Sequence, residues 1–85
     1  MKRKAVREIY ATICEWALFE GGRYRNGFAT FEEFLRRQAD TMSAAREVIN
    51  IEETAGRITP EEAQTIAERF TEFVKKEIKN ACKVK

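Results

Sequence analysis

The chain has 85 residues and a formal net charge of +2, with 44% hydrophobic and 35% charged residues and no histidine. This length indicates one domain with a thin core, and the hydrophobic content is typical of a folded chain rather than a disordered one. No stretch approaches the roughly 20 apolar residues that span a bilayer, so we expect a cytoplasmic protein. Its two cysteines, Cys14 and Cys82, are too few for a disulfide framework and are expected to be reduced thiols.

The first predicted element is a helix over residues 4–20. Apolar side chains recur there at the three- and four-residue spacing of one helical face. Gly21 and Gly22 follow, and glycine reaches the left-handed conformation that closes a helix without steric cost. We therefore expect the helix to end at Glu20. Its predicted core residues are Val6, Ile9, Tyr10, Ile13, Trp16 and Ala17.

A second helix is predicted over residues 31–55. Thr30 and Glu33 have the spacing of a capping box, in which each side chain accepts a hydrogen bond from the other residue's backbone amide. Short polar side chains among residues 40–43 compete for backbone hydrogen bonds, so the helix either continues or is bent or broken there. Its predicted apolar stripe comprises Phe31, Phe34, Leu35, Gln38, Met42, Ala45, Val48 and Ile49.

A third helix is predicted over residues 60–81. Gly56 closes the preceding helix, Pro60 suits a first helical position, and Thr59 has capping-box spacing to Glu62. Three amphipathic helices joined by short loops predict an all-α fold, a small antiparallel three-helix bundle in which residues 1–85 form a single domain. The end of the first helix, the first loop and the end of the third helix should then share one pole. The apolar positions of the third helix are Ala63, Ile66, Ala67, Phe70, Phe73, Val74 and Ile78.

Catalytic and metal chemistry find little support in the sequence. Ser43 is the only serine, and with no histidine the chain lacks the usual base for a nucleophile. Cys14 lies among apolar residues and is expected in the core, and two cysteines without histidine do not complete a zinc site. Residues 56–62 resemble the second half of an EF-hand loop, but the early calcium ligands are missing. We expect no enzyme activity, no metal and no cofactor.

Charge is segregated along the chain. Residues 40–72 carry three basic and eight acidic side chains, whereas residues 73–85 carry five basic and one acidic. Lysines at the end of a helix complement its dipole, which explains part of this pattern without a function. A basic pole is one candidate binding site, and an acidic face is the alternative. The basic candidates are Arg23, Tyr24, Arg25, Lys75, Lys76 and Lys79, and the acidic candidates are Glu52, Glu53, Glu61, Glu62 and Glu68.

Arg23, Tyr24 and Arg25 are the strongest of these candidates. They place a planar ring between two guanidinium groups, a combination suited to a phosphate, a nucleobase or an acidic protein surface. The alternative is that Tyr24 folds back onto Phe28 and caps the core, which would leave the two arginines in solvent. The sequence does not decide between these two roles.

The leading functional hypothesis is a non-enzymatic protein-binding module with another protein as its partner. A phage or mobile-element accessory that inhibits a nucleic-acid-processing defence enzyme, with a role like that of an anti-CRISPR protein, fits a chain this short. The first alternative is binding of nucleic acid or an anionic nucleotide by the basic pole, with an affinity that falls steeply with salt. The second is a homodimeric helical bundle in which a second copy buries apolar residues such as Phe19 and Phe73. No membrane partner is expected.

Overall fold

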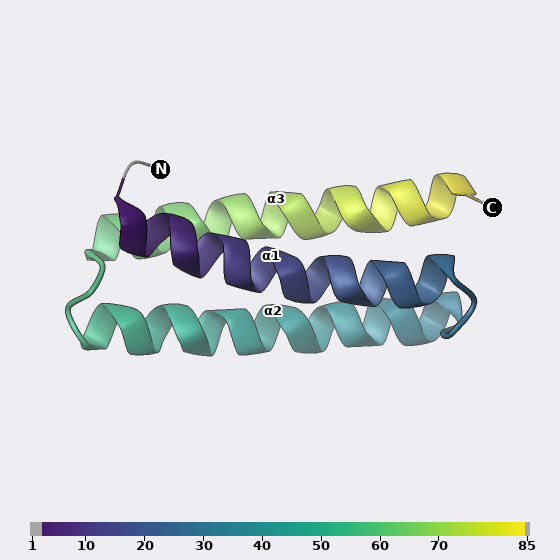
Figure 1. Ribbon diagram of the computed structural model, residues 1–85, viewed down its shortest axis with the longest axis horizontal. Coiled ribbons are helices and arrows are strands. Elements are labelled where there is room, and N and C mark those ends of the chain that lie inside the picture. Colours follow the sequence, from purple (N-terminus) through teal and green to yellow (C-terminus); the bar gives the residue numbers. More distant parts are fainter. Residues whose placement is uncertain (1–2, 85) are drawn as a thin grey trace.

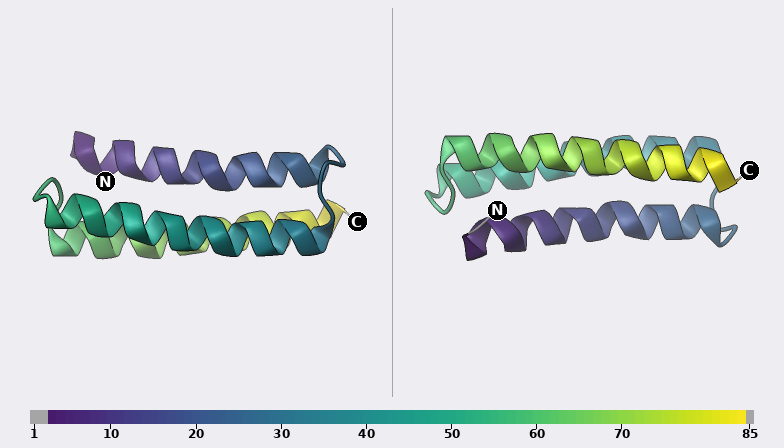
Figure 2. Two further views of the ribbon diagram at one scale, coloured as in Figure 1. Left: turned by 90° about the horizontal axis from the view of Figure 1, so that it is seen from below. Right: turned by 90° about the horizontal axis from the view of Figure 1, so that it is seen from above.

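The structure, a computed structural model, describes residues 3–84, which form three α-helices joined by short loops and contain no strand. α1 spans Lys4–Arg25, α2 spans Phe31–Thr54 and α3 spans Pro60–Val84. They form an antiparallel bundle 42 Å long and 19 by 15 Å across (Figure 1). Every helix contacts both others, and α1 lies alongside the pair formed by α2 and α3 (Figure 2). The predicted all-α three-helix bundle is confirmed.

All three helices contribute to the core. Ile13 of α1, Phe34 of α2 and Ile66 of α3 have no exposed surface. Burying a side chain of this kind stabilises the fold by about 1.5–3 kcal/mol, so these residues carry a large share of the stability. The prediction that Trp16 lies in the core is wrong, because 37% of it is exposed. Trp16 lies at the edge of the apolar face of α1, where neither neighbouring helix covers it completely.

α1 ends at Arg25, so the prediction that this helix ends at Glu20 is wrong. Gly21 and Gly22 both stay helical, and neither has a positive φ. Gly21 is buried, and a Cβ there would lie 3.0 Å from the Glu77 Oε1 atom of α3. Glycine at this position permits close contact between α1 and α3. Packing between the two helices therefore accounts for a glycine that local rules interpret as a helix end.

Both loops use the same local signals to reverse the chain. Gly27 has a φ of 82°, and the Phe28 amide donates to the Arg23 carbonyl over 2.8 Å, which is the Schellman pattern. Gly56, with a φ of 80°, closes α2 in the same way. In each loop the capping threonine follows three residues after the glycine. The two turns are therefore determined by short stretches of sequence.

The predicted capping boxes at the starts of α2 and α3 are both present. The Glu33 amide donates to Thr30 Oγ1 over 3.1 Å, and the Thr30 amide donates to Glu33 Oε1 over 2.9 Å. Thr59 and Glu62 form the equivalent pair, with distances of 3.1 and 2.8 Å. These contacts satisfy amides that would otherwise have no partner in the first turn of each helix.

α2 runs as one helix through residues 40–43, so the alternative of a bent or broken helix is not observed. Thr41 is buried in this segment, and Gln38, one turn earlier, is only 1% exposed. Gln38 Nε2 donates to the Ala17 carbonyl of α1 over 3.1 Å. Contacts with α1 thus hold the segment in helical conformation and override its weaker local preference.

Gln38 is an unusual core residue because only one end of its amide is satisfied. Its Oε1 atom is buried and has no hydrogen-bond partner among the described residues. A charge at this position would have neither solvent nor a cationic partner, and a buried carboxyl group without such partners stays protonated.

We predict that Gln38→Glu makes folding strongly dependent on pH. Burial raises the pKa of the new carboxyl group in the folded state, so stability falls as pH rises above the unfolded value of about 4.3. The expected loss at pH 7 is about 3 kcal/mol relative to acidic conditions, measured by urea unfolding at several pH values. Gln38→Met, which carries no titratable group, is the control, and equal pH profiles for the two variants would contradict the burial argument.

The capping box at Thr30 gives a second pH prediction. The hydrogen bond from the Thr30 backbone amide lowers the pKa of Glu33 below its usual value of 4.5. A lowered pKa stabilises the folded state above pH 4.5, and this contribution is lost as the pH falls through the folded-state value. Glu33→Gln should therefore lose less stability on acidification than the wild type.

Glu32→Gln provides the control, since it makes the same charge change at the neighbouring position outside the capping box. The stability of both variants is measured by thermal unfolding between about pH 3 and pH 7, a range that includes the titration of the carboxyl group. If Glu32→Gln reduces the pH dependence of stability as much as Glu33→Gln does, the capping box is not the source of that dependence.

Candidate functional site

The predicted basic site begins in the last turn of α1, because α1 continues through Gly22. Arg23 Nε lies 3.9 Å from Glu20 Oε1 within the same helix. Arg25 Nη1 lies 3.7 Å from Glu77 Oε1 of α3. Each guanidinium group therefore has a carboxylate partner inside the protein, which reduces the charge that it offers to a ligand.

Tyr24 packs into an aromatic cluster at the same end of the bundle. Its ring stacks on Phe34, with centroids 5.3 Å apart and an interplanar angle of 22°. It also meets Phe31 edge to face at 5.6 Å. The expected contact with Phe28 is wrong, because Phe28 is 72% exposed and the ring of Tyr24 packs on α2 instead. Tyr24 thus packs at the end of the core, as the alternative interpretation of this segment predicted. The rings that it contacts are Phe31 and Phe34 instead of Phe28.

Lys75, Lys76 and Lys79 are exposed on α3. Lys75 Nζ lies 3.7 Å from Glu72 Oε1, a pair between two exposed side chains that contributes little to stability. The contact between Arg25 and α3 places the lysines and the α1 arginines at one pole, as predicted. The six candidates nevertheless differ in their contacts, since Arg23 and Arg25 pair with partly buried carboxylates, Tyr24 packs on α2, and the three lysines are exposed.

The acidic candidates are also divided. Glu62 Oε1 accepts from Arg3 Nη1 over 2.7 Å, and Glu52 Oε2 lies 3.2 Å from Arg57 Nη1. The first contact joins the residue before α1 to the first turn of α3, and the second joins the end of α2 to the loop that follows it. Of the remaining candidates, Glu53 is half-buried, whereas Glu61 and Glu68 are exposed.

Cys14 is a core residue, as predicted, with 8% of its surface exposed. Burial raises the pKa of the Cys14 thiol, and its hydrogen bond with Tyr10 partly opposes this effect. A raised pKa disfavours the thiolate that a nucleophile requires. Within residues 3–84, no three histidine, cysteine, aspartate or glutamate side chains gather in a metal-binding arrangement. None of the three helices combines the length and apolar character needed to cross a membrane.

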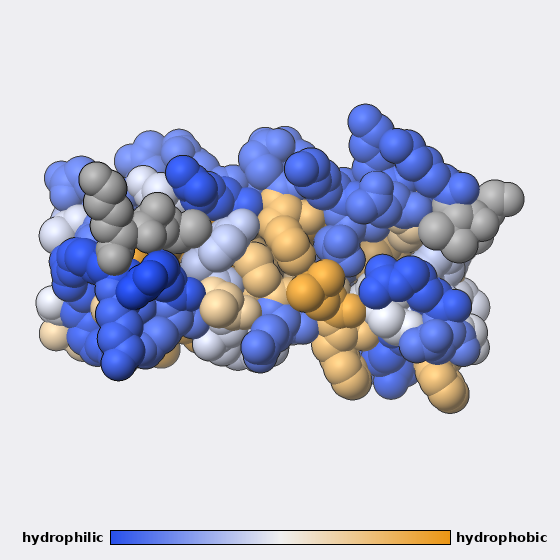
Figure 3. Space-filling view, turned by 45° about the horizontal axis from the view of Figure 1, so that its top comes forward, coloured by the Kyte–Doolittle hydropathy of each residue, from blue (hydrophilic) through white to orange (hydrophobic). Residues whose placement is uncertain are grey.

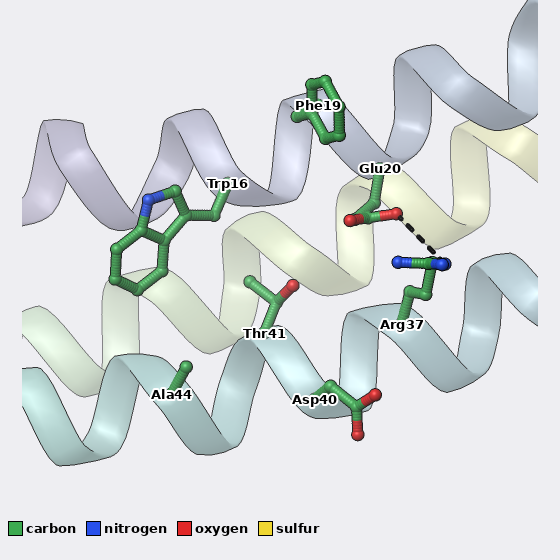
Figure 4. Close-up of a pocket in the computed structure, with 7 residues that line it drawn as sticks. All are labelled: Trp16, Phe19, Glu20, Arg37, Asp40, Thr41 and Ala44. Carbon is green, nitrogen blue, oxygen red and sulfur yellow. Dashed lines mark ion pairs between the residues drawn. The ribbon is translucent and has the colours of Figure 1, made fainter.

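A groove between α1 and α2 is the feature that the sequence interpretation missed. It has a volume of about 410 Å³, and Figure 4 shows Trp16 and Phe19 on its α1 side. Glu20 and Arg37 reach toward each other across one end of it, with their closest atoms 3.8 Å apart. We call this surface the groove face. It comprises Trp16, Phe19, Glu20, Arg37, Asp40, Thr41 and Ala44.

Apolar side chains on and beside the groove face are exposed to solvent. Phe19 is 64% exposed and Trp16 is 37% exposed, and Leu18 between them in sequence is 43% exposed. Figure 3 views the side formed by α1 and α3, not the groove face, and apolar side chains gather near the middle of that side as well. One signal could have indicated this surface from sequence: Leu18 and Phe19 lie outside the apolar stripe predicted for the first helix.

A second groove of about 420 Å³ lies between α1 and α3. Tyr10 and Phe73 supply its apolar part, and both are partly buried against the core. Four charged side chains line the rest, namely Glu68, Arg69, Glu72 and Lys76. Because Phe73 is partly covered within the chain, it offers less apolar surface to a partner than Phe19 does.

Comparisons of this chain with protein-family models, with curated proteins and with solved structures gave no match.

Tyr24 and Phe28 allow a direct test of how the aromatic cluster contributes to stability. We predict that Tyr24→Ala lowers the free energy of unfolding by about 2 kcal/mol, because it removes ring contacts with Phe31 and Phe34. Phe28→Ala should change it by less than about 0.5 kcal/mol, since that ring is largely in solvent. Urea unfolding measures both variants. Equal losses for the two would show that Tyr24 does not close the core.

Proposed function

We propose that this chain is a non-enzymatic protein-binding module and that the groove face is its contact surface. The observation that carries this proposal is the exposure of Trp16 and Phe19 beside a groove of about 410 Å³. Exposed apolar patches next to polar residues are typical of protein-interaction sites, and tryptophan and arginine are common among the residues that dominate binding.

The groove face combines an apolar floor with charged edges. Trp16 and Ala44 line its apolar part, and Arg37, with a side chain 47% exposed, stands at one end. Apolar contacts at the centre of an interface supply much of the affinity, whereas charges at the edge guide orientation and association rate. This layout supports recognition of a folded protein surface or a helix.

The narrower prediction, an inhibitor of a nucleic-acid-processing defence enzyme, stays a prediction. For the alternative of nucleic-acid binding, the exposed lysines of α3 are the remaining support. Arg23 and Arg25 already have carboxylate partners, and the Tyr24 ring stacks on Phe34. Their contribution to a phosphate or nucleobase site is reduced accordingly.

We predict that Phe19→Asp lowers capture of partner proteins from a nuclease-treated lysate of the source cells by roughly tenfold or more, because it places a charge in the apolar part of the interface. The tagged wild-type chain provides the reference. Ile51→Asp is the matched control, since Ile51 is also 64% exposed but does not line the groove. Quantitative mass spectrometry of the captured proteins measures the effect.

If Phe19→Asp and Ile51→Asp reduce the capture of partner proteins equally, the groove face has no specific role in binding. Loss of all binding on nuclease treatment would favour the nucleic-acid alternative. In that case Lys76→Ala/Lys79→Ala should abolish the binding, and its affinity should fall steeply with salt.

A further inference from the structure

Gly22 differs from the other three glycines because nothing among residues 3–84 explains it. Gly27 and Gly56 adopt positive φ values, and a Cβ on Gly21 would collide with the Glu77 side chain. At Gly22 an added Cβ would meet nothing within 4 Å, and the backbone is helical. Glycine inside a helix is less stable than alanine by roughly 0.5–1 kcal/mol, yet no contact in the described part of the chain requires it. Close approach by a second molecule would explain it.

Phe19 lies on the same helix, three residues before Gly22. It is 64% exposed and stands beside the groove lined by Trp16 and Ala44. A projecting ring and an adjacent groove thus occur together on one surface, and Gly22 lies about one helical turn from the ring, beside the residues that line the groove. A surface that carries both a projection and a matching recess can pair with a copy of itself about a two-fold axis.

Charges on the same surface are suited to this pairing. Arg37 and Asp40 lie three residues apart on α2 and both line the groove. Arg37 makes one long contact, with Glu20 at 3.8 Å, and Asp40 has no ion pair within the described residues. In an antiparallel pair of copies, Arg37 of each would face Asp40 of the other. A second copy therefore complements the charge of this surface without any change in sequence.

We infer that the groove face binds a second copy of this chain, with the two α1 helices packed antiparallel. In this dimer Phe19 of each copy enters the groove of the other, Gly22 permits the close approach, and Arg37 pairs with Asp40 across the interface. This inference rests on the proposed function, because it names the partner of the same surface.

Gly22→Gln gives the first test, because it should stabilise the folded monomer, or leave its stability unchanged, and weaken the dimer. The side chain enters open space in the monomer and improves helix propensity, so the thermal midpoint of dilute protein should rise or stay the same. In the dimer it blocks close approach, and the dissociation constant should rise roughly tenfold or more. Sedimentation equilibrium between about 1 and 500 μM measures the dissociation constant. Ala39→Gln, at an exposed position of α2 outside the groove, is the control and should leave it unchanged.

Charge reversal gives the second test, and both variants are expected to remain folded. Arg37→Glu and Asp40→Arg should each dimerise at least roughly tenfold more weakly than the wild type, since each places like charges opposite one another. An equimolar mixture of the two variants should recover the dimer mass, because each copy then faces the opposite charge. Circular dichroism confirms that both variants remain helical.

A wild-type chain that is monomeric across this range would overturn the inference. So would a dimer that persists in Gly22→Gln, or a mixture of the charge variants that stays monomeric. A monomeric wild type whose capture of another protein still depends on Phe19 would overturn only the second-copy partner and leave the proposed function standing. Failure of both experiments would remove the groove face as a binding surface.

Discussion

At Gly21 the backbone of α1 lies so close to α3 that an added Cβ would stand 3.0 Å from the Glu77 carboxylate. α1 continues as a helix past this position to Arg25, whose guanidinium group lies 3.7 Å from the same carboxylate. It also places Tyr24 on the helical face that packs on Phe34. The geometry of one pole therefore depends on a position where only glycine fits without a shift of its neighbours.

The same pole shows how a small protein uses its charges internally. Glu20 pairs with Arg23 within α1 and with Arg37 of α2, so the second contact connects the two helices. At the opposite pole Arg3 donates to Glu62 and to the Arg57 carbonyl, each over 2.7 Å. Exposed ion pairs of this kind contribute little individually, but they fix the positions of loops and helix ends. The charge segregation of the sequence thus serves the architecture as well as any binding role.

The groove face follows from the geometry of a three-helix bundle. Each helix is covered by its neighbours over only part of its circumference, and a chain of 85 residues has a high ratio of surface to volume. Large side chains at the edge of an apolar stripe, such as Trp16, then line the grooves between helices. The exposure of Phe19 goes further, because this residue lies outside the stripe and contributes little to the core.

Local interactions within short segments determined much of the fold of this protein. The three helices, both capping boxes and the closure of α2 at Gly56 depend on residues a few positions apart, so the sequence alone predicts them. Most of the core follows from helical periodicity in the same way. Only the tertiary structure decided that Gly21 continues a helix, that Tyr24 packs on α2 and that Trp16 borders a groove. Each of these depends on contact with a neighbouring helix, and local propensity contains no information about that contact.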